Sequence, residues 1–334
     1  MKSDHSSRGR RGGPPPARFE HEAAFYAGPG DHLRMCLAFV EEGLDRGEPV
    51  MVALVPERSE ALSTALGAAA DAIQFVDMTE LGRNPARIIP QWQQFITERG
   101  GSGPVRGIGE PAWPGRTFVE YAEAALHEGL LNLAFDNGQP WRLMCPYDLT
   151  GLPPEVLDEA RRTHPVIHNE PDGSERFGGY EHTVRGFSTL LPVPARGQRV
   201  DFDRDELPLI RGFAVRIAQA SGLSPAATEN LALAVHELAT NSVVHGRGPA
   251  ALWYWEEPDA VVVEVHDAGF IGDPLVGRRA PDPMQEDGRG VWMANQLCDL
   301  VQIRSSEAGT QVRVRMRTRS RPDQALTSLM TGRA

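Results

Sequence analysis

Apolar and polar positions alternate in two rhythms along the first half of the chain. Residues 50–55 are apolar without interruption, which is typical of a strand covered on both faces. Stretches with apolar residues at helical spacing separate this run from others like it. The predicted strands are residues 23–27, 50–55, 73–77, 105–109 and 141–146, and the predicted helices are residues 33–44, 59–67, 86–99, 117–133 and 153–163. Strands that alternate with helices predict a mostly parallel α/β sheet with right-handed crossovers.

The second half of the chain has a different order of elements. It begins after a polar, glycine-rich stretch at residues 167–186 and a proline-interrupted stretch at residues 190–196. Ser224 followed by Pro225 has the form of an N-cap and a first helical position, so a helix is expected to begin there. The other predicted helices are residues 205–220 and one that opens at 288–290, and the predicted strands are residues 199–202, 261–267, 300–305 and 310–316. This order indicates a second domain of the α+β class.

Composition narrows the class of protein. The chain has 334 residues, a length typical of about two domains, and a net charge of −11, which argues against a nucleic-acid-binding surface. No apolar run approaches the roughly 20 residues of a membrane span. Cys36, Cys145 and Cys298 lie far apart without metal-ligand spacing, so we interpret them as buried thiols of a cytoplasmic protein. Lys2 is the only lysine, so arginines or backbone amides must make any phosphate contact in the folded part.

One segment of the second half carries candidate chemistry. Glu237 and Asn241 are four residues apart, which places both on one face of a helix, while Leu231, Val235 and Leu238 form the opposite, apolar stripe. A carboxylate beside a carboxamide can activate a hydroxyl and hold a hydrated Mg²⁺. The alternative is an ordinary amphipathic helix with two polar surface residues.

Three further motifs follow this helix in a fixed order. Asp267-Ala-Gly269 ends a predicted strand, Gly288-Arg289-Gly290 opens a helix, and Gly309-Thr310 precedes the last strand. Over residues 200–318 this order resembles the GHKL (Bergerat-type) ATP-binding fold, and more closely the anti-sigma-factor serine kinases of high-GC Gram-positive bacteria. The resemblance implies an α/β sandwich with helices on one face of a mixed sheet. It also implies a mobile lid at residues 271–287.

The resemblance also assigns roles to residues. Asp267 would accept the adenine amino group, and glycines before a helix N-terminus would cradle phosphates. The second glycine of the family's Asp-x-Gly-x-Gly is displaced here to Gly272. Thr310 could bond the adenine side or simply begin a strand, and Arg289 could add charge or only be solvated. The residues expected to bind the cofactor ATP with Mg²⁺ are Asn241, Asp267, Gly269, Gly288, Arg289, Gly290 and Thr310, and the metal ligand is Asn241.

Glu237 favours one subclass. Anti-sigma serine kinases have a glutamate at this position, whereas histidine kinases usually have asparagine there and often a lysine where Val244 stands. The resemblance therefore implies a protein serine/threonine kinase in which Glu237 is the catalytic base. The expected substrate is an anti-anti-sigma (STAS-type) protein, with a sigma factor as the alternate partner. A non-catalytic ATP-dependent binding switch and an orphan histidine kinase are the alternatives.

The first half resembles the MEDS sensory domain, a RecA-like module with three α/β layers. The matching residues are His21, Phe25-Tyr26, Cys145-Pro146-Tyr147-Asp148 and His164-Pro165. Cys145 and His164 could be drawn as a nucleophile and its base, or as core packing. The glycine turn at residues 28–31 lacks a phosphate-loop lysine, so we interpret it as a tight turn.

These resemblances divide the chain into expected segments: a tail at residues 1–18, the MEDS-like domain at 19–166, a linker at 167–198, the ATP-binding domain at 199–318 and a tail at 319–334. Ligands of α/β sheets bind at the carboxyl ends of strands. We therefore expect a small, mostly apolar ligand near residues 28–31, 56–58 and 109–113. Self-association into a homodimer stays open.

Overall fold

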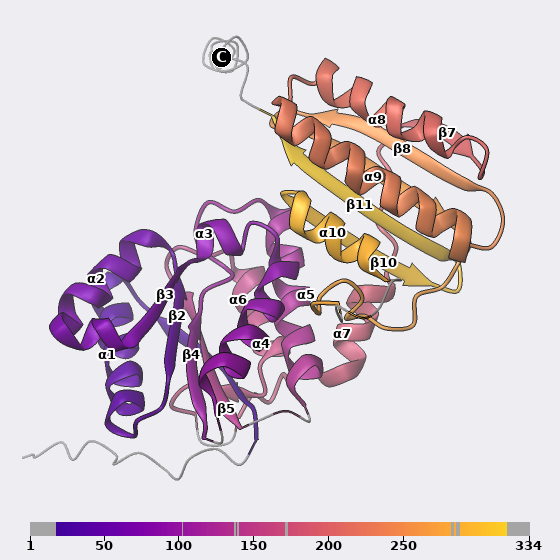
Figure 1. Cartoon of the computed structure of the whole chain (residues 1–334). Coiled ribbons are helices and arrows are strands. Elements are labelled where there is room, and N and C mark those ends of the chain that lie inside the picture. Colours follow the sequence, from indigo (N-terminus) through magenta and orange to yellow (C-terminus); the bar gives the residue numbers. More distant parts are fainter. Residues whose placement is uncertain are drawn as a thin grey trace, which may run out of the picture.

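The computed structural model describes residues 18–101, 103–136, 138, 140–170, 173–281, 284 and 288–318 (Figure 1). The expected tails lie outside these residues, apart from Arg18. No helix in the described ranges is long and apolar enough to cross a membrane. The strands are β1 Glu20–Tyr26, β2 Val50–Leu54, β3 Ile73–Asp77, β4 Val105–Gly109, β5 Trp141–Asp148, β6 Val166–Ile167, β7 Gln198–Phe202, β8 Ala250–Glu257, β9 Ala260–Asp267, β10 Leu300–Ser306 and β11 Gly309–Arg317. The α-helices are α1 Pro29–Asp45, α2 Pro56–Leu66, α3 Met78–Leu81, α4 Ile88–Arg99, α5 Phe118–Phe135, α6 Pro154–Thr163, α7 Gly179–Ser188, α8 Leu207–Ala220, α9 Pro225–His245 and α10 Arg289–Leu297.

The first six strands form one sheet in the order β3-β2-β4-β5-β1-β6, and every pairing in it is parallel. Side chains of β2 alternate between its two faces. Val50, Val52 and Leu54 join one buried cluster with residues of α1 and α2, while Met51 and Ala53 join another with residues of α4 and α5. Both faces of the sheet are therefore covered, which confirms the three-layer α/β class expected for the first half.

The stretch at residues 167–198, expected to be a linker, contains ordered structure. Val166 and Ile167 form β6 at the edge of the first sheet, and α7 packs against α5. Phe187 of α7 is buried, and a Cβ atom on Gly129 of α5 would lie 2.5 Å from the Thr183 hydroxyl oxygen, so the two helices approach closely. The polar composition had concealed one apolar helix face.

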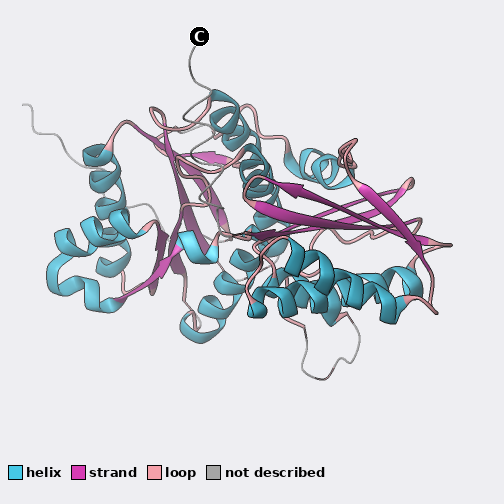
Figure 2. Ribbon diagram, turned by 90° about the horizontal axis from the view of Figure 1, so that it is seen from above, coloured by secondary structure: helices cyan, strands magenta, loops and turns pink. Residues whose placement is uncertain are grey.

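The remaining strands form a second sheet in the order β10-β11-β9-β8-β7, with every pairing antiparallel. The expectation of a mixed sheet is corrected here, because consecutive strands joined by short turns return beside one another. Helices α8, α9 and α10 lie on one face of this sheet (Figures 1 and 2). Strand β8 was not predicted, although residues 250–255 are nearly all apolar.

Helix α9 begins as the sequence predicts. The Ser224 hydroxyl accepts a hydrogen bond from the backbone N–H of Ala227, and Pro225 is the first helical residue. Leu231, Val235 and Leu238 are buried against the sheet. This packing fixes the rotation of the helix, so Glu237 and Asn241 must face the opposite direction.

Candidate ATP site and its connection to the N-terminal half

Helices α9 and α10 cross where the Glu/Asn motif meets the glycine turn. A Cβ atom on Gly290 would lie 2.8 Å from Asn241 Nδ2 and 3.2 Å from Glu237 Oε2. Glu237 and Asn241 are half-buried, so solvent still reaches them. The structure thus brings Glu237, Asn241 and Gly290 together, although 49 positions separate Asn241 from Gly290 in the chain.

The N-terminus of α10 is open on the side of the glycine turn. Gly288, the N-cap, has φ 84°, a left-handed conformation that favours glycine, and a Cβ atom there would meet nothing within 4 Å. The helix has no side-chain cap. Backbone N–H groups in the first turn of such a helix form an anion-binding position, and Arg289 adds a cationic side chain beside it.

A second cluster surrounds Asp267 at the end of β9. Its Oδ2 accepts a 2.5 Å hydrogen bond from the Ser242 hydroxyl of α9, and its Oδ1 accepts one of 2.7 Å from the Gly269 backbone N–H. An ionised carboxylate offers about four acceptor positions, so these bonds orient Asp267 and leave capacity for a further donor. A Cβ atom on Gly269 would lie 2.7 Å from Asp267 Oδ1, which explains the need for glycine there.

Strand β11 braces this corner from the other side. Thr310 pairs with Asp267 in the sheet, and its hydroxyl donates to the Gly269 carbonyl at 2.9 Å. Ser305 lies 2.8 Å from the Thr310 hydroxyl and accepts a 2.8 Å hydrogen bond from the Ile271 backbone N–H. Thr310 therefore holds the loop after β9 in place. Ser242 and Ser305 are site residues that sequence reasoning missed, since a lone serine in a helix or strand carries no distinguishing signal.

The loop predicted as a lid is described at residues 271–281 and at Met284. Its first part packs on α10, because Asn295 Nδ2 donates a 2.8 Å hydrogen bond to the Gly277 carbonyl and Leu275 is buried. Asn295 is also bound from the N-terminal half. Asn84, which is fully buried, donates to the Asn295 backbone oxygen at 2.9 Å and lies 3.2 Å from its Oδ1. Asn295 thus links the lid, α10 and the first domain.

A carboxylate on α5 forms the second link between the two halves. Glu123 has no exposed surface, and its Oε1 accepts hydrogen bonds from Arg304 and, at 3.1 Å, from Gln302 of β10. Its Oε2 lies 3.6 Å from Nη2 of Arg278, a lid residue that is also buried. Burial lowers the pKa of Arg278 to about 10, so it stays charged at neutral pH. One sensor carboxylate therefore holds both the lid and the edge strand of the second sheet.

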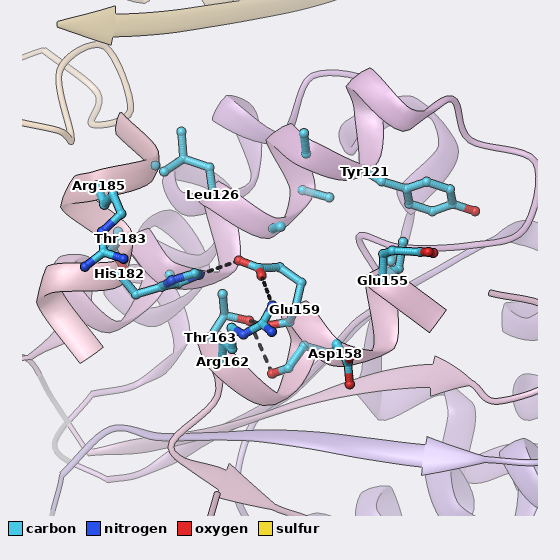
Figure 3. Close-up of a pocket in the computed structure, with 18 of the residues that line it drawn as sticks. Tyr121, Leu126, Glu155, Asp158, Glu159, Arg162, Thr163, His182, Thr183 and Arg185 are labelled. Carbon is cyan, nitrogen blue, oxygen red and sulfur yellow. Dashed lines mark hydrogen bonds and ion pairs between the residues drawn. The ribbon is translucent and has the colours of Figure 1, made fainter. Parts of the chain in front are cut away.

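The first half also contains a cavity of about 660 Å³ between α5, α6 and α7 (Figure 3). Tyr121 and Leu126 of α5, Val156 of α6 and Gly186 of α7 line it, and Arg304 of β10 reaches it from the second domain. This cavity does not lie at the strand ends where we expected an apolar ligand. At those ends Arg58 pairs with the fully buried carboxylate of Glu110 and lies 3.6 Å from Asp148, so charged groups occupy that edge.

Comparison with known families places both halves. Residues 200–316 match the family model of the histidine kinase-like ATPase domain, and residues 20–165 match that of MEDS, the methanogen/methylotroph, DcmR sensory domain. The chain is a MEDS sensory domain fused to a histidine kinase-like ATPase domain. This confirms the resemblance stated for both halves and indicates a regulatory, kinase-like protein that binds ATP. No curated protein matches the chain.

One solved ATPase domain resembles the fusion at the level of the fold. It is 12% identical, spans 51% of this chain and 67% of its own, and has a TM-score of 0.30. A likeness this low adds nothing to the two sheets described above. The roles of individual residues in the ATPase domain stay predictions, although the structure brings the residues together.

Proposed function

We propose that the ATPase domain is a protein serine/threonine kinase of the anti-sigma type. The observation that carries this proposal is the position of Glu237, whose Oε2 lies beside Gly290 at the start of α10 and one helical turn from Asn241. A carboxylate at this point can accept the proton of a hydroxyl that attacks a phosphate held at the helix N-terminus.

The chain offers a group for each part of ATP with Mg²⁺. Asp267 would receive the adenine amino group on its remaining acceptor positions. The backbone N–H groups of Gly288, Arg289 and Gly290 would hold the phosphates, and Asn241 would hold Mg²⁺. When bound, ATP supplies the phosphoryl group, and the protein's contribution is mostly positioning and charge neutralisation. The open space at Gly288 and the absence of a side-chain cap on α10 support this fit.

The substrate that best fits this proposal is an anti-anti-sigma (STAS-type) protein, with a sigma factor as the alternate partner. The MEDS domain would regulate the transfer through Asn84 and Glu123, since both bind elements that carry or cover the ATP site. A ligand acts in this way only if it binds one state of the ATPase more tightly than the other.

A non-catalytic binding switch is the second candidate. The contacts from Arg278 to Glu123 and from Gly277 to Asn295 favour it, because they allow lid position alone to signal between the domains. A switch of this kind needs ATP binding but no base.

Glu237→Gln separates the two candidates. It keeps the size of the side chain but removes the base, so the kinase should lose roughly 10²–10⁴-fold in phosphotransfer while ATP binding persists. Titration calorimetry with ATP and labelled-phosphate transfer should be measured on the full chain. Unchanged transfer by this variant would remove the proposed base and with it the kinase mechanism.

A further inference from the structure

Four side chains with metal-binding atoms converge inside the MEDS domain, where the proposed kinase mechanism uses none of them. They are His21 on β1, Glu128 on α5, Cys145 on β5 and His164 at the C-terminal end of α6. All four residues are buried, and one ligand atom from each lies within 4.8 Å of the others. The fold therefore gathers imidazole, carboxylate and thiol groups from four separate elements at a single point.

Hydrogen bonds on the outer side of the two imidazoles determine which nitrogen carries the proton. Asn132 donates from Nδ2 to the Thr163 carbonyl at 2.8 Å, so its Oδ1 faces His21. An amide oxygen can only accept, so His21 Nδ1, 3.1 Å away, must donate. His164 Nδ1 lies 2.8 Å from the Ala160 carbonyl oxygen and must donate for the same reason. Metal-binding histidines are held through their outer nitrogen in this manner.

The inner nitrogens of both neutral rings then present lone pairs to an acceptor. Glu128 Oε2 lies 3.0 Å from His21 Nε2 and 2.7 Å from His164 Nε2. The sulfur of Cys145 lies 3.5 Å from His21 Nε2. Among the described residues, His164 Nε2 and Glu128 Oε1 are buried without a hydrogen-bond partner. Buried acceptors that face one another are unfavourable unless a proton or a cation lies between them.

We propose that His21 Nε2, Glu128 Oε2, Cys145 Sγ and His164 Nε2 bind a divalent transition-metal ion of the zinc class. These are the ligand types that Zn²⁺ prefers, and they fill its four tetrahedral positions. Zinc bonds of about 2.0–2.3 Å place tetrahedral ligand atoms about 3.3–3.8 Å apart, within the span of the cluster. A carboxylate and a thiolate also neutralise the double charge of the ion, which a fully buried site requires.

The bound ion would have a structural and sensory role. All four positions come from the protein, so no position is left for a catalytic water. The ion would hold α5 and α6 against β1 and β5. Ala160 and Thr163 both line the cavity between α5, α6 and α7, while Ala160 also accepts the outer proton of His164 (Figure 3). Occupancy of the site would therefore control the geometry of this cavity.

Elemental analysis of the full chain, purified without a metal-affinity tag, tests the proposal. We expect about one zinc per chain, at least a tenfold loss of zinc in Cys145→Ser, and no loss in Cys36→Ser. Cys36 is the matched control because it is also buried in the MEDS domain beside a histidine, His32, but outside the four-residue cluster. Asn132→Ala should weaken zinc binding roughly 10–100-fold, since it removes the bond that orients His21.

A spectroscopic measurement on the unmodified chain guards against a variant that fails to fold. Co²⁺ titrated into metal-depleted protein should produce a thiolate-to-cobalt charge-transfer band that zinc abolishes. A folded wild-type chain that contains no metal and gives no such band with Co²⁺ would overturn the proposal. The cluster would then be a buried proton network. Loss of zinc in Cys36→Ser equal to that in Cys145→Ser would also contradict it.

Discussion

Asp267→Asn tests the adenine side of the site, and the structure sets its magnitude. The variant keeps the oxygen that accepts the Gly269 N–H, and the Ser242 hydroxyl can rotate to accept from the new amide group. The local fold should therefore survive. What changes is the remaining acceptor capacity, because an amide nitrogen only donates and would oppose the adenine amino group.

A buried donor or acceptor left without its partner costs about 1–3 kcal/mol, so the Kd for ATP should rise about 5- to 150-fold. Titration calorimetry on the full chain with Mg²⁺ measures this directly. Ser242→Ala is the matched control: it removes only the internal 2.5 Å bond to Asp267 and should weaken ATP binding less. Equal Kd values for wild type and Asp267→Asn, with both proteins folded, would refute the assignment of Asp267 to adenine.

Two predictions concern the contact between the domains. Glu123→Gln leaves two buried guanidinium groups without their carboxylate and should lower the free energy of unfolding by about 3–5 kcal/mol, whereas the exposed Glu229→Gln should not; urea denaturation measures both. Burial tends to raise the pKa of Glu120, but hydrogen bonds from Thr117 and nearby arginine charges outweigh it and hold the pKa below its ordinary value of 4.5. Because Glu120 pairs with Arg317, this stabilisation should be complete above pH 4.5 and be lost as the pH falls through the lowered pKa, which acid denaturation of wild type and Glu120→Gln would show.

The sequence predicts the elements of the first half well because its strands are buried on both faces. Residues 73–77 and 105–109 form β3 and β4 as expected. Helix α7 could not be predicted in the same way. Its residues are polar except on the one face that meets α5, and the glycines near its start resemble those of a loop. The antiparallel order of the second sheet likewise depends on tertiary pairing.

The candidate ATP site follows from motif order, but its connections do not. Glu237, Asn241 and Gly290 come together as their spacing suggests. The links through Asn84 and Glu123 join residues about 180–210 positions apart, which no local pattern reveals. The same holds for the proposed metal ligands. Cysteine spacing gave no sign of a metal site, because the fold supplies one ligand from each of four distant elements.

Phosphotransfer from labelled ATP to a candidate anti-anti-sigma protein tests the central claim most directly. Wild type and the α9 control Glu229→Gln should label a serine or threonine of that protein, while Glu237→Gln should do so roughly 10²–10⁴-fold more slowly. Phosphosite mapping identifies the acceptor residue. An acid-labile phosphohistidine on the chain, or equal transfer by wild type and Glu237→Gln, would contradict a serine/threonine kinase that uses Glu237 as its base.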